Sequence, residues 1–325
     1  MCPRQDSNLR SRLRRAVLYP LSYGGGTHFR APGEISSRAA RALNAPPTSR
    51  SQIPRRLGRM TPEQLRALLE EVAAQAARTG ELPDEAQAGP PVGPLFRPTD
   101  TRVAGVVADW VTPVAQRWVR LLDTDLPPRA LASTLAQGLS ERREVAAVEV
   151  APSGLIAITL DDATRSGIIP VVQSTPETYA VRAGGRYRPV LERPDWRAPD
   201  DPLRSVQVSH ARLCRLLRNA AAAGVQQRPN ERLEVLGHVA ERHLLVAVAD
   251  LPQRLDSHEG DEQASTRALV DLGHLADAWD HPTRPAVVGA SIEHVHGARM
   301  ALADTVRIVL RNGLARLGAA APERM

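Results

Sequence analysis

Lysine is absent from this chain, because all 42 residues in its Lys+Arg total are arginine. This absence excludes chemistries that depend on a lysine ammonium group. A phosphate-binding loop of the G-x-x-x-x-G-K type, a Schiff-base enzyme and a nucleotide loop of the K-M-S-K type all need that group. The chain therefore cannot use any of these three devices.

Cysteines and long apolar runs are also scarce. The two cysteines, Cys2 and Cys214, are too few for a disulfide framework or a zinc set. No run of about 18 apolar residues is present, so we expect no membrane span. The 42% of hydrophobic residues is enough for packed cores in a chain of 325 residues. These features predict a soluble, cytoplasmic protein that does not contact membranes.

The positive charge is concentrated near the N-terminus. Residues 1–59 contain 12 arginines against Asp6 and Glu34, a net charge of +10, whereas the whole chain carries +6. Residues 60–325 therefore carry a net charge of −4. The overall charge suggests a nucleic-acid binder, but most of it belongs to the first 59 residues.

The first 59 residues lack apolar periodicity and the apolar core of a secretory signal. Residues 6–9 can be encoded by the codons GAT TCG AAC CTN, whose reverse complement resembles the T-arm of a transfer RNA gene. Residues 19–23 can be encoded as the complement of a D-arm, at the spacing expected within one such gene. We therefore expect residues 1–59 to be a non-native or disordered leader, an antisense translation, with Met60 as the true start.

The remaining chain divides by pattern into four segments. Thr61 and Pro62 begin an apolar-periodic helix that ends near Gly80, and a Pro/Gly-rich linker follows to residue 94. Residues 95–172 predict a small α+β domain. Residues 173–198 predict a connector with a hairpin over 178–190. Residues 199–325 predict an all-α helical bundle, so the expected fold class is α+β.

Within the α+β segment, Trp110, Val114, Trp118 and Leu121 recur at helical spacing. Pro128 is expected to start a second helix, and strands at 145–150 and 155–160 flank a Pro/Gly turn. In the bundle, helices are expected near 203–223, 231–249, 264–280, 290–312 and at the C-terminus.

Two segments of the bundle carry a family resemblance. The run V-Q-V-S-H-A-R at 206–212 resembles the V-Q-Y-A-H-A-R helix of arginyl-tRNA synthetases, and N-G-L-A-R-L-G-A-A-A-P-E-R-M at 312–325 is similar to that family's C-terminal sequence. The resemblance implies a DALR-type anticodon-binding domain over 199–325. More weakly, R-P-T-D at 97–100 and S-G-L-I-A-I at 153–158 resemble the family's N-terminal tRNA-contacting domain.

The family's catalytic domain has no counterpart between these segments. That domain is several hundred residues long and has an H-I-G-H signature, whereas only residues 171–198 join the two segments here. The nearest match, H-E-G-D at 258–261, lacks the second histidine. The family's tyrosine is replaced by Val208, and Trp279 alone remains of an aromatic cluster that would stack on a base. The resemblance therefore implies tRNA binding without catalytic residues.

The candidate tRNA contacts combine local charge with the resemblance. Arginines at every third position of the 203–223 helix share one side of it, and the alternative that they form only a solvated face stays open. Residues 182–218 hold nine arginines and four acids, a net charge of +5. The candidates are Gln207, His210, Arg212, Arg215, Arg218, Arg182, Arg186, Tyr187, Arg324 and Met325.

No cofactor or metal site is expected. His274, Asp277 and His281 have the spacing of ligands on one helix face, and His294 and His296 could chelate, but neither group has a second ligand cluster. Capping or surface histidines explain both groups better. Cys214 lies among apolar neighbours and is expected to be a buried small hydrophobe.

Together these observations predict a non-catalytic arginyl-tRNA synthetase paralogue whose partner is tRNA. A partner enzyme that uses aminoacyl-tRNA would fit the same prediction. One alternative is an ATP-dependent arginine–tRNA ligase that works with a separate catalytic chain. The other is a protein-interaction scaffold that has lost RNA binding.

Overall fold

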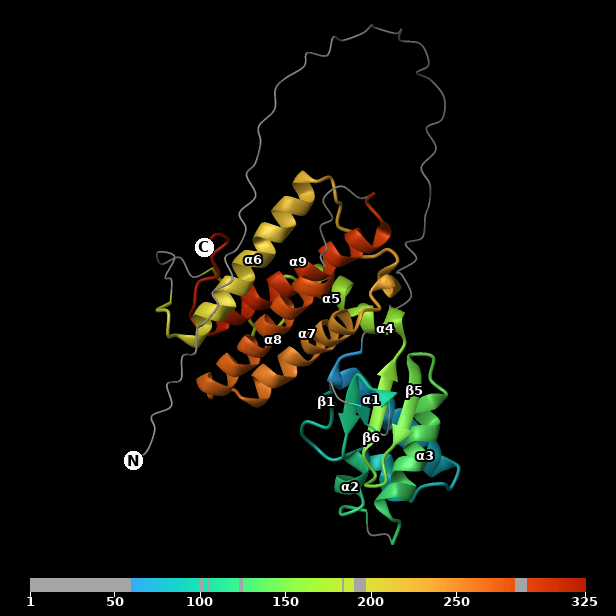
Figure 1. Ribbon diagram of the computed structural model, residues 1–325. Helices are drawn as coiled ribbons and strands as arrows, with labels where there is room; N and C mark the ends of the chain where they lie inside the picture. The colour runs from blue at the N-terminus through green and yellow to red at the C-terminus, as the bar shows by residue number, and fades with distance from the viewer. Residues whose placement is uncertain are drawn as a thin grey trace, which may run out of the picture. The chain divides into compact units, whose positions relative to one another are not determined.

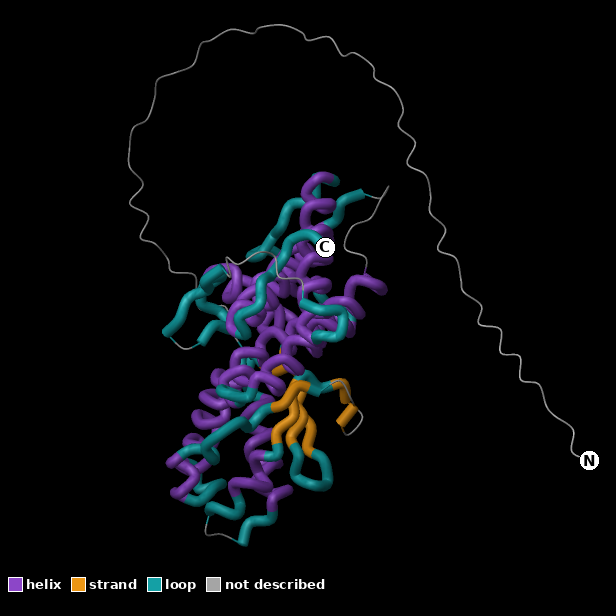
Figure 2. The backbone as a smooth tube through the Cα atoms, turned by 90° about the vertical axis from the view of Figure 1, so that its left-hand side faces the viewer, coloured by secondary structure: helices purple, strands orange, loops and turns teal. Residues whose placement is uncertain are grey.

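A computed structural model describes residues 60–99, 102–103, 106–122, 125–182, 184–189, 197–283 and 291–325. The expected leader, residues 1–59, lies outside this described part. The segments described combine a four-stranded antiparallel sheet and a separate two-stranded pair with many helices (Figures 1 and 2). The predicted α+β class is confirmed at this level. No helix among the described residues is long and apolar enough to cross a membrane.

The first helix is α1 (Pro62–Arg78), and its start follows from its sequence. Pro62 occupies the first helical position, where its missing amide hydrogen is not needed. The side chain of Gln64 reaches back to accept a hydrogen bond from the Thr61 amide, at 3.2 Å. The chain leaves the helix through Gly80, whose φ of +78° suits glycine. The helix predicted from Thr61 to Gly80 is therefore confirmed.

The sheet has the strand order β1-β4-β6-β5, and all its pairs are antiparallel. Strands β5 and β6 form the expected hairpin, and α1 and α3 cover one face of the sheet (Figure 2). A two-residue pair, β2 with β3, lies apart from it. The elements are β1 (Arg97–Pro98), β2 (Arg102–Val103), β3 (Val106–Val107), β4 (Trp110–Thr112), α2 (Val114–Trp118), α3 (Pro128–Ser140), β5 (Val145–Val150) and β6 (Ile156–Leu160).

The core of this part lies between α1, α3 and the sheet. Leu65 and Leu69 of α1 are fully buried, as are Leu131 and Leu135 of α3 and Ile158 of β6. The two helices approach closely at Gly138, where a Cβ would lie 2.5 Å from a Val72 methyl carbon. Burial of these large apolar side chains is the main stabilising contribution.

Two expectations for this part are wrong. Trp110 lies on β4, opposite Ile158, and not on a helix. Pro113 disfavours helical geometry at the residue before it, so the helix starts only at Val114. Residues 83–94 are not a free linker, because Arg66 donates to the Pro91 carbonyl at 2.9 Å and Arg117 donates to the Pro94 carbonyl at 2.7 Å. A short 3-10 helix, η1 (Asp84–Ala88), opens this segment.

The hairpin expected over 178–190 is also wrong for the residues described there, which include no strand. Side chains of the last long helix bind backbone carbonyls just before and at the start of this segment, at Pro176 and Tyr179. The Asn312 amide donates to the carbonyls of Pro176 and Tyr179, at 2.8 Å each, and Arg311 donates to the Pro176 carbonyl at 2.8 Å. The segment is therefore a loop held against that helix.

The helices after β6 begin with two short ones, and four long helices then pack side by side (Figure 1). Gln173 of α5 donates to the Ala301 carbonyl at 3.0 Å, which joins α5 to α9. The elements are α4 (Asp162–Ser166), α5 (Ile168–Ser174), α6 (Pro202–Ala222), η2 (Leu233–Val235), α7 (Val239–Ser257), α8 (Glu262–Thr283) and α9 (His294–Arg316).

The long helices differ from expectation at their ends. The helix expected over 231–249 starts at Val239 and continues through Pro252. A proline leaves the carbonyl four residues earlier without its helical donor, and the Tyr179 hydroxyl donates to that carbonyl, Val248 O, at 2.8 Å. No helix forms over 317–325, because Gly318, at φ +65°, turns the chain away from the axis of α9.

Candidate nucleic-acid interface

Helix α6 carries three of the candidate arginines. Pro202 takes its first position, and the Asp201 carboxylate accepts from the Leu203 amide at 2.8 Å. Successive residues turn by about 100°, so Arg212 and Arg218 lie about 120° apart with Arg215 between them. The opposite side packs into the bundle through buried residues that include Val206 and Leu213.

The three arginines have different partners. A guanidinium nitrogen of Arg212 lies 3.0 Å from the Asp277 carboxylate of α8, which also accepts from Ser209 at 3.2 Å. Arg218 donates to the Glu323 carbonyl at 3.2 Å. Within the described part of the chain, the Arg215 side chain forms no ion pair and no hydrogen bond. Arg215 is therefore the arginine of this face whose charge is least offset.

Gln207 and His210 do not lie on this surface. Their exposed fractions are 0% and 1%, so neither touches solvent. Both bind the backbone of residues 317–325, which we call the C-terminal segment. Gln207 donates to the Ala320 carbonyl at 2.9 Å, and Nδ1 of His210 lies 2.9 Å from the Pro322 carbonyl. The structure thus gives both residues a positioning role.

The protonation of His210 follows from its surroundings. Burial lowers the pKa of the imidazole to about 4, and the bond to the Pro322 carbonyl opposes this shift. The ring is neutral at pH 7, with its proton on Nδ1, because a carbonyl can only accept. Cys214 lies one turn further along, 3.9 Å from the ring, and burial raises the pKa of its thiol. The buried, apolar role predicted for Cys214 is consistent with this environment.

The C-terminal segment lies along α6 and ends beside it (Figure 1). Three of its carbonyls accept hydrogen bonds from α6 side chains, at Ala320, Pro322 and Glu323. Arg324 and Met325 are exposed. They therefore extend the same surface that carries Arg218.

A second cluster of candidates surrounds a hollow of about 300 Å³ beside the end of α9. The Arg311 guanidinium carbon lies 4.0 Å from the centre of the Tyr187 ring, a cation–π contact. Arg182 pairs with Glu259 at 3.2 Å, and both side chains are exposed. The hollow, which we call the Tyr187 hollow, is lined by Val181, Arg182, Arg186, Tyr187, Arg188, Asn312, Ala315 and Arg316.

Several residues around this hollow carry no clear signal in the sequence. Arg188, Arg311 and Arg316 were not among the candidates. Arg311 precedes the run at 312–325 that resembles the family and Arg316 lies within it, but the pattern of neighbouring residues does not mark either as a contact. Asp277 was considered as a metal ligand, yet it pairs with Arg212. Among the residues described, no group of three or more His, Cys, Asp or Glu side chains is placed to hold a metal ion.

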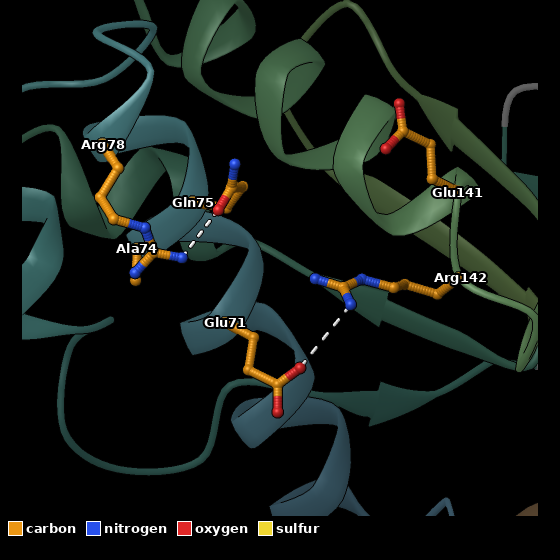
Figure 3. A pocket seen from close by; sticks show the side chains of 6 residues that line it. All are labelled: Glu71, Ala74, Gln75, Arg78, Glu141 and Arg142. Atoms are coloured by element: carbon orange, nitrogen blue, oxygen red, sulfur yellow. Dashed lines mark hydrogen bonds and ion pairs between the residues drawn. The ribbon is translucent and has the colours of Figure 1, made fainter.

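Another hollow, between α1 and α3, has a different character (Figure 3). Its volume is about 570 Å³, and its lining includes two acids and two arginines. Arg142 lies 3.7 Å from Glu71, and Arg78 donates to Gln75 at 2.7 Å. Because its charges balance, this hollow is a poor site for a polyanion.

Comparison with known proteins finds a family that is similar to the part of the chain that includes most of α6. Residues 206–325 match the family model of the DALR anticodon binding domain. This C-terminal part of the chain is therefore similar to a DALR anticodon-binding domain. An arginine–tRNA ligase of Moorella thermoacetica is 38% identical over 133 residues, covering 39% of this chain and 23% of the relative.

Two further arginine–tRNA ligases are also similar to the chain. The enzyme of Heliobacterium modesticaldum is 34% identical over 134 residues, covering 39% of this chain and 23% of the relative. The enzyme of Clavibacter sepedonicus is 32% identical over 176 residues, covering 50% and 31%. The chain thus spans between about a quarter and a third of these relatives. The similarity to them therefore concerns part of this chain and a smaller part of each relative.

Proposed function

We propose that this protein binds tRNA through its DALR domain and does not itself attach an amino acid. The observation that carries the proposal is the exposed arginine face of α6 within a domain that matches an anticodon-binding family. The planar guanidinium group of arginine can form two parallel hydrogen bonds to one phosphate, a bidentate contact. Arg215 is the central contact of this face, with Arg218, Arg324 and Met325 beside it.

The non-catalytic part of the proposal rests on the chain between the sheet and the bundle. The residues described between 161 and 201 hold α4, α5 and loop, and the described strands of the chain are antiparallel. A doubly wound nucleotide-binding domain needs parallel strands joined by helices. The chain also has no lysine to contact the phosphates of ATP. Cytoplasmic tRNA is the proposed partner, since two cysteines do not suggest an oxidising compartment.

The salt dependence of tRNA binding tests the proposal. Removal of one phosphate contact should lower the magnitude of the slope of log K against log salt by about 0.7 to 0.9. Arg215→Ala should therefore flatten the slope by about this amount. Arg212→Ala should do less, because Asp277 already offsets that charge. Asp277→Asn should strengthen binding by freeing Arg212.

The matched control is Arg129→Ala, which removes the same charge from an exposed position in the first turn of α3, and Arg143→Ala is a second control whose charge Glu144, 3.0 Å away, already offsets. Binding is measured by fluorescence anisotropy with labelled tRNA at several salt concentrations. If the controls flatten the slope as much as Arg215→Ala, the α6 face is not the contact. If the wild-type chain binds no tRNA at low salt, the function is not tRNA binding, and the scaffold alternative replaces it.

A further inference from the structure

The aromatic side chains of the DALR domain do not provide a stacking platform on the α6 surface. Trp279, the residue expected to supply one, has an exposed fraction of 0%. The other described tryptophans, Trp110 and Trp118, and also Phe96, are buried in the core. Tyr179 packs on the core and uses its hydroxyl for the Val248 carbonyl. Among the described aromatic rings this leaves Tyr187, which is half-buried and lines a hollow.

The chemistry around Tyr187 suits a nucleotide. Arg311 lies over the ring at 4.0 Å, and its other contacts, to the Pro176 carbonyl and Glu177, hold the guanidinium in place. Arg186 and Arg188 flank the ring in sequence, line the same hollow and are exposed. An aromatic face beside cations is the arrangement that binds single-stranded nucleic acids, with a base on the ring and phosphates on the arginines.

Nearby acids set which arginines are available. Arg182 pairs with Glu259, so its charge is partly offset. Arg316 is nearly buried, donates to the Leu255 carbonyl at 2.9 Å and pairs with Asp256 at 2.8 Å. Within the region that the structure describes, Arg186 and Arg188 show no such pairing. These two residues are therefore the phosphate contacts that the hollow offers.

We infer that the Tyr187 hollow binds one unstacked nucleotide of the RNA, with its base against the Tyr187 ring and its phosphate on Arg186 and Arg188. This inference rests on the proposed tRNA binding but concerns a separate surface, since no residue of α6 lines the hollow. The contact is tolerant of base identity, because every base has a face that can stack. It would supply the stacking contact that the buried Trp279 cannot give.

The test compares Tyr187→Leu with Tyr187→Phe in the full chain, using labelled tRNA. Loss of one stacked base costs about 1 to 3 kcal/mol, so Tyr187→Leu should weaken binding about 5- to 150-fold. The phenylalanine variant keeps the ring and should bind within about twofold of wild type. The salt slope should be unchanged in both variants, because neither removes a charge.

A second pair of variants does not touch the ring. Glu259→Gln removes the acid that competes for Arg182 and should strengthen binding. Glu231→Gln is the matched control, since Glu231 also pairs with an arginine on the surface, Arg228, at 2.6 Å. The loop that holds Arg228 and Glu231 contacts the start of α9, because the Arg228 amide donates to the Gly297 carbonyl at 3.2 Å. Ala315, which lines the hollow, lies 18 positions further along α9, about 27 Å away and well beyond the screening length. Glu231→Gln should therefore leave binding unchanged.

The outcomes separate this inference from the proposed function. If the wild-type chain binds tRNA and Tyr187→Leu binds it with the same affinity, nucleotide binding in the Tyr187 hollow is rejected and the proposed tRNA binding stands. Equal weakening by leucine and phenylalanine would also reject stacking. A lowered melting temperature would show that Tyr187→Leu unfolds. In that case the tRNA affinities of Glu259→Gln and Glu231→Gln test the inference, and equal effects of these two variants would reject nucleotide binding in the Tyr187 hollow. Absence of wild-type tRNA binding would reject both proposals together.

Discussion

His210 and Asp250 are buried residues whose contributions to stability depend on pH in opposite directions. Burial lowers the pKa of His210 to about 4, below the ordinary value of 6.5. Burial also raises the pKa of Asp250 to about 6, above the ordinary value of 3.8, and Arg254 opposes that shift. In both cases the neutral form is favoured because the protein interior solvates charge poorly.

For His210, we expect stability to fall as the pH falls from 6.5 to 4. The unfolded chain takes up a proton in this window and the folded chain does not, so acid favours unfolding. The loss should reach about 3 kcal/mol at pH 4. His210→Asn keeps a donor for the Pro322 carbonyl and should remove this pH dependence. Urea unfolding of both chains at pH 7 and pH 4.5 measures the difference, and parallel changes in the two would contradict the prediction.

For Asp250, the sign is reversed. The folded carboxyl keeps its proton to higher pH than the unfolded one, so its contribution is favourable below pH 3.8 and is lost as the pH rises through 6. Asp250→Asn should therefore be more stable than wild type at pH 8, by up to about 3 kcal/mol, and no more stable at pH 4. Denaturant melts at the two pH values test this. A variant that is destabilised at pH 8 would show that the carboxylate has a partner it needs.

At the scale of elements, α7 depends on a side chain far away in sequence. The Tyr179 hydroxyl donates to the carbonyl that Pro252 leaves without a helical partner. Tyr179→Phe should cost about 1 to 2 kcal/mol, because a buried carbonyl loses its hydrogen bond. In a Pro252→Ala background the restored amide can bond to Val248, so the same change should cost less. Additive costs in this double-mutant cycle would disprove the link.

Elements whose signals are local were predictable, and elements fixed by distant contacts were not. Thr61, Pro62 and Gln64 specify the start of α1 within four residues, and the turn at 151–154 specifies the β5–β6 hairpin. The loop after α5 has strand-like alternation, but its carbonyls are bound by Asn312 and Arg311, more than 130 residues away along the chain. No local pattern could have revealed that competition.

The candidate site divides in the same way. The periodicity of α6 correctly placed Arg212, Arg215 and Arg218 on its exposed side. Gln207 and His210 belong to the run that resembles the family, but periodicity could not show that the C-terminal segment would cover them. Arg212 pairs with Asp277, which lies on another helix, so the pattern of residues along α6 could not predict this ion pair.

At the scale of the whole molecule, we expect no arginine activation by the purified chain. The described residues between 161 and 201 form short helices and loops. An enzyme that activates arginine needs a site for ATP, and the part of this segment that the structure describes offers no sheet to form one. Arginine-dependent exchange of pyrophosphate into ATP measures activation directly. The expected rate is that of a buffer control, with an authentic arginine–tRNA ligase as the positive control. Exchange by the pure chain would overturn the non-catalytic proposal and favour a ligase.

The C-terminal segment is held by its backbone, since Gln207, His210 and Arg218 bind carbonyl oxygens. This attachment has a practical consequence for how the protein is purified. A polyhistidine tag fused after Met325 would begin beside Arg218, and its imidazoles would add ligands and charge to the arginine face of α6. Such a tag would alter the apparent affinity for tRNA even if every native contact were intact. Purification handles for the binding experiments therefore belong ahead of α1.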